Sequence, residues 1–199
     1  MLRTWALRMG ALLILAPHLA LAHTEARAAD GFIHGLMHPF SGLDHTLAMI
    51  AVGLFAARLN GRAFWLMPTS FVLLVNLGAA FAYSDVGLPY VEIGIAASVL
   101  VTGLLIAARP HFPAAIGIAL VGFFGIFHGH AHGMEVPDEA SLLTYMAGFS
   151  LATALLHVAG IALAKAASKV TAASTKRLER IAGVGIALSG IGMLVNASL

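Results

Sequence analysis

The chain has 199 residues, of which 60% are hydrophobic and 10% are charged, whereas soluble domains carry roughly 25% charged residues. The mean hydropathy of +0.92 points the same way. These values exclude a soluble globular domain and a disordered chain, and eleven Lys and Arg against nine Asp and Glu exclude a basic nucleic-acid-binding surface. With no cysteine in the sequence, disulfides, thiolate zinc sites and cysteine nucleophiles are excluded too. The composition predicts an integral membrane protein, and its unusual feature is ten histidines.

Residues 1–22 have the pattern of a secretory signal peptide. Arg3 and Arg8 precede a short apolar stretch, and the segment closes on Ala-Leu-Ala, a small-residue cleavage site. The alternative is an uncleaved first transmembrane helix, which Pro17 and the shortness of the apolar stretch disfavour. Cleavage would leave His23 at the mature N-terminus, outside the cytoplasm, and a mature chain with no net charge.

Residues 23–199 are predicted to form one all-α domain of six transmembrane helices, because a span needs about 20 mostly apolar residues. Charges and clusters of Pro, Gly and Asn divide this region into six candidate spans. They lie at roughly 39–58, 63–84, 90–108, 113–133, 141–164 and 180–198. The stretch 164–177, rich in Ala, Ser, Thr and Lys, is predicted to be a linker before the last span.

The charged residues predict the orientation of these spans. If residue 23 starts outside, the turns at 58–62, 109–111 and 165–180 are cytoplasmic, and they hold eight of the nine basic residues of the mature chain. This distribution satisfies the positive-inside rule and puts both mature termini outside. Eight of the nine acidic residues fall on the outer side. Such a negative outer face would concentrate cations.

Ionisable side chains in three predicted spans lie near the outer interface. The segment HPFSGLDH contributes His38, Asp44 and His45, and the third span contributes Glu92. An unpartnered ionisable group at such a depth costs up to about 2.5–3.5 kcal/mol, so it indicates function. His38 and His45 are two turns apart and cannot bind one ion from a straight helix. Either the segment bends at Pro39 and Gly42, or these histidines belong to two successive sites.

The fourth span ends in FHGHAHGME. His128 and His132 are separated by four residues and lie on one helix face, a spacing that lets two imidazoles share a metal ion. Glu135 continues this face if the helix persists, whereas His130 points about 200° away. Glycines at 125, 129 and 133 are predicted to let a neighbouring helix pack closely. Ligands from His, Asp and Glu without Cys suit borderline divalent ions such as Ni²⁺, Co²⁺ or Zn²⁺.

Two residues keep alternative interpretations. Asp44 is either a direct oxygen ligand or the acceptor that orients an imidazole. His157, in the middle of the fifth span, is more simply a hydrogen-bonded core residue than part of an inner pathway.

HPFSGLDHTLAMIAVG and FHGHAHGME resemble the two signature motifs of the HupE/UreJ family of nickel/cobalt permeases, and the resemblance covers essentially the whole mature chain. It implies a multi-pass protein of the bacterial inner membrane that takes up Ni²⁺, or Co²⁺, for metalloenzymes such as hydrogenase or urease. The resemblance also implies which residues bind the metal ion. The matching motif positions are His38, Asp44, His45, His128, His132 and Glu135. His130 matches a less fixed position, and Glu92 is included for its depth and charge.

The sequence thus predicts a permease and not an enzyme. Its partners would be the divalent ion and the lipid bilayer, with no nucleic acid and no prosthetic group, and a homo-oligomer stays open. The main alternative is a membrane-embedded zinc-type metallohydrolase using the same His/Asp cluster. A haem protein with axial histidines and a metal sensor fit the motifs less well.

Overall fold

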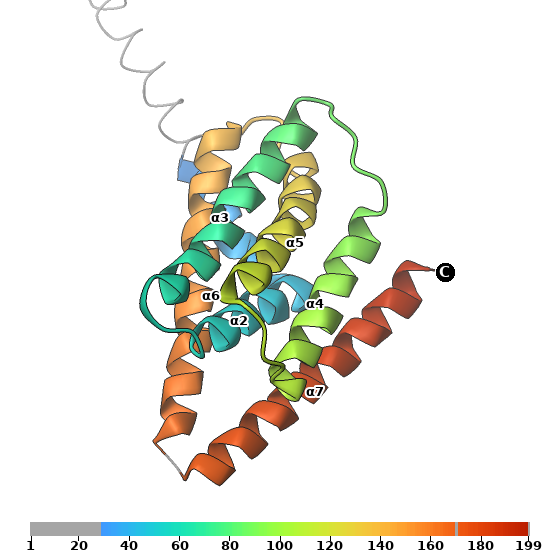
Figure 1. The fold of residues 1–199 in the computed structure, drawn as a ribbon. Helices are drawn as coiled ribbons and strands as arrows, with labels where there is room; N and C mark the ends of the chain where they lie inside the picture. The colour runs from blue at the N-terminus through green and yellow to red at the C-terminus, as the bar shows by residue number, and fades with distance from the viewer. Residues whose placement is uncertain (1–28, 170, 199) are drawn as a thin grey trace, which may run out of the picture.

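The computed structural model describes residues 29–169 and 171–198 of the chain. The predicted signal peptide 1–22 and His23 lie outside the described residues. Within them the fold is all-helical, and it forms a bundle in which α7 lies along α4 at one side (Figure 1).

The helices correspond to the predicted spans if the bent pair is counted as one span, although α7 begins well before the predicted start at 180. Five are long and apolar enough to cross a membrane, or six if a bent pair at the start counts as one span. The described elements are η1 (His38–Phe40), α2 (Leu43–Ala56), α3 (Gly61–Tyr83), α4 (Val91–Ala108), α5 (Ala114–Met134), α6 (Leu142–Ser168) and α7 (Ala172–Ala197).

The first span, predicted at 39–58, is broken near its start. A helical segment, Ala29–Phe40, precedes α2 and meets it at an angle of 79°. Pro39 stands in the first turn of η1, and Gly42 adopts an extended conformation that ends the segment before α2 begins. The hydroxyl of Thr46 donates a hydrogen bond of 2.7 Å to the carbonyl of Pro39 and ties the two helices across the break. The bent arrangement, one of two left open by the sequence, is the one present.

The stretch 164–177, predicted to be a linker before the last span, is mostly helical. Most of it continues α6 to Ser168 or begins α7 at Ala172. Ala and Lys are among the strongest helix formers, so the composition that marks a break in hydropathy does not mark a break in the helix. The side chain of Thr171 accepts a hydrogen bond from the backbone N–H of Ser174 and caps the start of α7.

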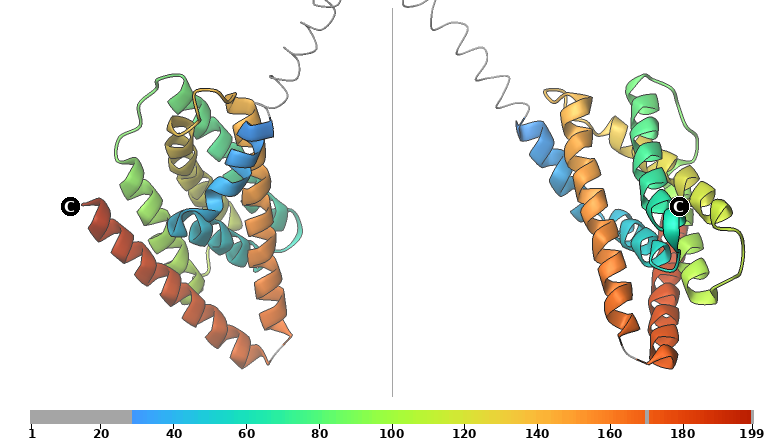
Figure 2. Two further views of the ribbon diagram at one scale, coloured as in Figure 1. Left: turned by 180° about the vertical axis from the view of Figure 1, so that it is seen from behind. Right: turned by 60° about the vertical axis from the view of Figure 1, so that its left-hand side comes forward.

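Close backbone contacts hold the helices around the middle of the bundle. Gly125, Gly129 and Gly133 of α5 each face the backbone of α3, which confirms the predicted packing stripe. The segment before η1 lies beside α6 in both views of Figure 2, with Gly35 against the backbone of Tyr145. These contacts bring α2, α3, α5 and α6 together around the first-span break.

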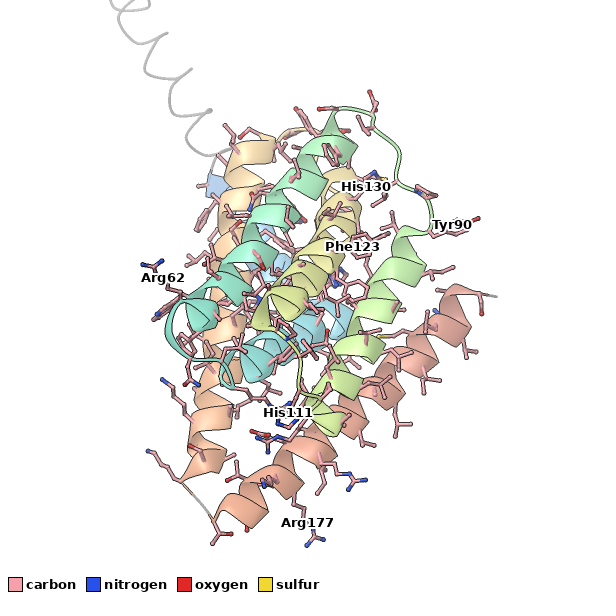
Figure 3. The ribbon with its side chains drawn as sticks, viewed as in Figure 1. Arg62, Tyr90, His111, Phe123, His130 and Arg177 are labelled. Atoms are coloured by element: carbon pink, nitrogen blue, oxygen red, sulfur yellow. The ribbon has the colours of Figure 1, made fainter. Side chains whose placement is uncertain are left out.

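The two ends of the bundle carry opposite charges. His111 and Arg177 lie in the lower half of the view in Figure 3, whereas Tyr90 and His130 lie in the upper half. We call the end that holds Arg58, Arg109 and Arg177 the basic end. The acidic end is the one with the α3–α4 and α5–α6 loops, which hold Asp85, Asp138 and Glu139. At the basic end, one carboxylate oxygen of Glu179 in α7 pairs with Arg58 at 2.9 Å and Arg109 at 3.0 Å. Arg58 also donates to the carbonyls of Leu105 and Ile106 in the last turn of α4, so this cluster joins α2, α4 and α7.

Candidate metal site

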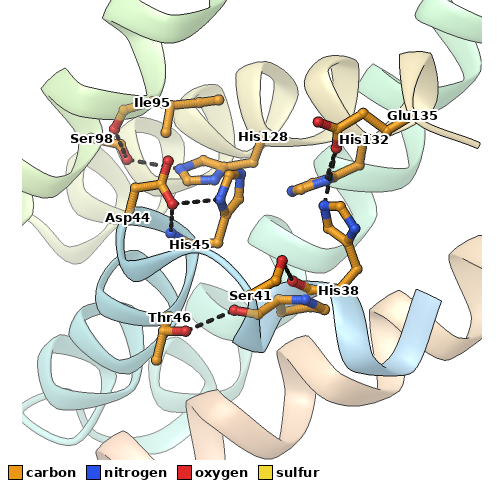
Figure 4. A network of polar contacts seen from close by, with 11 residues as sticks. His38, Ser41, Asp44, His45, Thr46, Ile95, Ser98, His128, His132 and Glu135 are labelled. Atoms are coloured by element: carbon orange, nitrogen blue, oxygen red, sulfur yellow. Dashed lines mark hydrogen bonds and ion pairs between the residues drawn. The ribbon is translucent and has the colours of Figure 1, made fainter. Parts of the chain in front are cut away.

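The break before α2 places its first residues beside the last turns of α5 (Figure 4). Any side chain at Gly42 would collide there, since a Cβ would stand 2.5 Å from Oδ1 of Asp44 and 2.9 Å from Nδ1 of His45. A side chain at this position would therefore displace Asp44 or His45. The imidazole of His45 lies against those of His128 and His132, with ring centroids 5.0 and 4.3 Å apart.

One group of ligands lies at the end of α5. We call His38, His132 and Glu135 the Glu135 trio, because one carboxylate oxygen joins the other two. Oε2 of Glu135 accepts hydrogen bonds from Nε2 of His38 at 3.0 Å and Nδ1 of His132 at 3.2 Å. One ligand atom from each residue lies within 4.8 Å of the others, a grouping suited to a metal ion.

The trio combines a charged group with buried imidazole. Glu135 lies just past the end of α5, and hydrogen bonds from His132 and then His38 hold the pKa of its carboxyl well below the usual range. It therefore carries the negative charge that a cation requires. His132 is fully buried, and within the described part of the chain its Nε2 has no hydrogen-bond partner.

A second group lies one turn deeper. We call Asp44, His45, Ser98 and His128 the Asp44 group. Oδ1 of Asp44 accepts hydrogen bonds of 2.8 Å from the backbone N–H and from Nδ1 of His45. Since Nδ1 donates, Nε2 of His45 carries the lone pair, and it is buried without a partner among the described residues.

Ser98 of α4 fixes the tautomer of His128, as Asp44 does for His45. Its hydroxyl donates to the carbonyl of Ile95 at 2.6 Å, so it accepts from Nε2 of His128 at 2.8 Å. Nδ1 of His128 is left buried and, as far as the structure describes the chain, unpartnered. Oxygen acceptors that fix the tautomer of an imidazole are the usual outer support of metal-ligating histidines. The neighbouring imidazoles of His45 and His128 thus each have one buried nitrogen, Nε2 and Nδ1 respectively, that makes no hydrogen bond to a described residue.

Six of the eight predicted site residues come together in these two groups: His38, Asp44, His45, His128, His132 and Glu135. Glu92 of α4 stands beside them, lining with Asp44 and Asn196 a cavity of about 280 Å³ between α2, α4 and α7. His130 lies elsewhere. Its Nε2 donates to the carbonyl of Val86 in the α3–α4 loop at 2.9 Å, because it projects from the opposite face of α5.

Three further residues surround the imidazoles without having been singled out in the sequence. Ser98 orients His128, the buried ring of Tyr145 lies 6.0 Å from that of His38, and Phe149 lies 4.3 Å from His132. A serine or an aromatic residue in an apolar span is too common to be recognised without the fold. The only signal was the four-residue spacing of Tyr145 and Phe149 on one face of α6.

Comparisons with known proteins agree with the motifs. The family model described as HupE / UreJ protein matches residues 11–193. Protein HupE of Rhizobium leguminosarum bv. viciae is 43% identical over 180 residues, covering 90% of this chain and 92% of the relative. No solved structure is significantly similar to the chain. A family match over almost the entire length, together with this close relative, establishes that the chain belongs to the HupE/UreJ family.

Proposed function

We propose that the chain is a permease that moves Ni²⁺ or Co²⁺ across the bacterial inner membrane, from the periplasm into the cytoplasm. The observation that carries the proposal is the Glu135 trio, in which ligand atoms from two separate helical segments lie within 4.8 Å inside a bundle of membrane-type helices. Membership of the HupE/UreJ family supports it, as does a ligand set of imidazole and carboxylate, which suits borderline divalent ions.

The two groups act in succession in this proposal. Acidic side chains draw the ion to the acidic end, and the Glu135 trio replaces part of its hydration shell. His45 then passes the ion on to His128, since its ring contacts those of both His132 and His128. Asp44 and Ser98 hold the two deeper rings in the tautomer that offers a lone pair. Several moderate sites in series allow release as well as capture.

The direction of transport follows from the charge distribution. The positive-inside rule assigns the basic end, with Arg58, Arg109 and Glu179, to the cytoplasm. A potential of about 100 mV, negative inside, then favours inward movement of a divalent ion by roughly 4.6 kcal/mol, at about 2.3 kcal/mol per charge. The potential alone is a sufficient driving force.

Metal uptake tests this function directly. In cells or liposomes containing the protein, His45→Ala and His132→Ala should each reduce the initial rate of Ni²⁺ uptake at least tenfold, because each removes an imidazole with an unpartnered nitrogen. His34→Ala is the matched control, since His34 is an exposed imidazole at the same end of the bundle. Wild-type uptake rates in both site variants would refute the proposal. Metal-dependent hydrolysis of amide or lipid substrates without metal transport would favour the hydrolase instead.

A further inference from the structure

A stripe of buried side chains leads along α6 away from the Glu135 trio. Its members, spaced four residues apart, are Tyr145, Phe149, Thr153 and His157, and each is at most 2% exposed. We call them the α6 stripe. Its first two residues contact the trio, since Tyr145 lies against His38 and Phe149 against His132. Its last two extend toward the basic end.

His157 lies clearly deeper than the candidate metal site. It follows the first residue of α6 by fifteen residues, or about 22 Å of helical rise, whereas His128 is six residues, or about 9 Å, from the end of α5. Phe71 of α3 contacts both imidazoles, with ring centroids 5.4 Å from each. The ring of Phe71 therefore lies between His128 of the candidate metal site and His157.

The polar atoms of this deeper region have no partners. Both ring nitrogens of His157 and the hydroxyl of Thr153 are buried and make no hydrogen bond within residues 29–169 and 171–198. Almost all buried polar groups in proteins are hydrogen-bonded, so an imidazole with neither nitrogen paired contributes little to stability. His157 is thus buried in the core as expected, but it lacks the expected hydrogen bond to any residue that the structure describes. The simpler explanation is a ligand that uses these atoms.

Packing of the backbone fixes this region in place. Gly53 of α2 lies directly against the carbonyl of His157, and Gly160 lies against that of Ile50, so α2 and α6 are in backbone contact on either side of the imidazole. The two helices cannot move closer to each other at this point. The imidazole stays directed into the bundle, where His128 and Phe71 lie.

We propose that His157, with the hydroxyl of Thr153 one turn away, forms an inner binding position for a partly hydrated borderline divalent cation. This position lies beyond the Asp44 group on the way to the basic end. The inference deepens the proposed function and rests on it, since it assigns a second station to the same pathway. An imidazole and a hydroxyl supply two of the ligands, and retained water supplies the rest.

The test uses full-length protein in which His157 is replaced by phenylalanine, which fills a similar volume without a ligand. His157→Phe should lower the initial rate of Ni²⁺ uptake into liposomes at least tenfold. It should also bind one Ni²⁺ fewer per chain at saturation in equilibrium dialysis, while the affinity of the remaining ions is unchanged. Because the substitution removes two unpaired polar atoms, the melting temperature should stay the same or rise. Leu155→Phe, at an exposed position on the same helix, is the control and should match the wild type.

Two kinds of result overturn the inference, and a third separates it from the proposed function. Uptake by His157→Phe at the wild-type rate would show that the ion does not use this position, while leaving the permease intact. A reduced rate without the loss of a bound ion, or with a marked fall in melting temperature, would show a structural role. If the wild type moves no metal but His157→Phe still loses one bound ion, the inner site stands and the proposed transport fails.

Discussion

At the scale of single residues, the candidate site contains imidazoles whose tautomers are fixed by neighbouring hydrogen-bond acceptors. Asp44 is bonded to the backbone and ring of the residue that follows it, and Ser98 is bonded to a carbonyl of its own helix before it accepts from His128. Both residues therefore act on a histidine and leave the opposite ring nitrogen free. This geometry favours the orienting role of Asp44 over that of a direct ligand, the two alternatives left open by the sequence.

Replacement of Asp44 by asparagine tests this role. The amide keeps the size of the side chain but loses the charge that stabilises the proton on Nδ1 of His45, so we expect Ni²⁺ affinity to fall about 10–100-fold without being abolished. Isothermal titration of purified protein measures the change. Asp138→Asn, at an exposed carboxylate of the same end, should leave the affinity unaltered. Complete loss of binding in Asp44→Asn would instead identify the carboxylate as a ligand.

How far the site could be foreseen depends on whether its geometry is local. The faces of α5 follow from helical spacing, so the common face of His128 and His132 and the departure of His130 were predictable. The distances between α2 and α5 were not, because they depend on where the first span breaks. Ser98 was missed for the same reason, since nothing in an apolar span marks the serine that a distant histidine will contact.

At the scale of elements, the break before α2 is the feature that makes the site. It lets His38 and His45, which a straight helix would hold two turns apart, approach the same ring of His132, at 4.6 and 4.3 Å. Pro39 and Gly42 were recognisable as candidates for such a break. The 79° angle was not, because it depends on how η1 and α2 pack against α6.

Substitution of Gly42 by alanine should disrupt this arrangement. The added methyl group would meet the carboxylate of Asp44 and the ring of His45 within 2.9 Å, so one of them must move. We expect Ni²⁺ uptake to fall more than fivefold while the protein still inserts in the membrane. Gly87→Ala is the control, because no atom lies within 4 Å of a Cβ at that position. Equal uptake by the two variants would mean that the close approach at Gly42 is not needed.

At the scale of the whole molecule, the chain separates its charges between two ends. Imidazoles and carboxylates gather at the acidic end, whereas Arg58, Arg109 and Glu179 join α2, α4 and α7 at the other. The positions of the charged residues along the sequence predicted this separation. The ion pairs at the basic end could not be predicted from the sequence, because they join residues as far apart in the chain as Arg58 and Glu179.

The orientation of this charge pattern can be mapped with single cysteines, since the sequence has none of its own. In intact cells from which the outer membrane has been permeabilised, Asp138→Cys should react with a membrane-impermeant maleimide. Lys176→Cys should react only after the inner membrane is opened. The expected contrast follows from the positive-inside rule. Labelling of Lys176→Cys but not Asp138→Cys in intact cells would reverse the proposed direction of transport.

The break at Gly42 also decides which helix ends meet at the site. α5 ends there, so the negative end of its macrodipole faces the Glu135 trio, whereas α2 begins there and presents a positive end. The first attracts a cation, and at the second the full negative charge of Asp44 in the first turn of α2 outweighs the roughly half charge of the helix end. An unbroken first span would have carried its positive end away to the surface. By starting a helix inside the bundle, the chain sets a carboxylate at a helix end that stabilises its charge, so in the proposed function a cation beside His45 meets a net negative group and not the bare positive end of a helix.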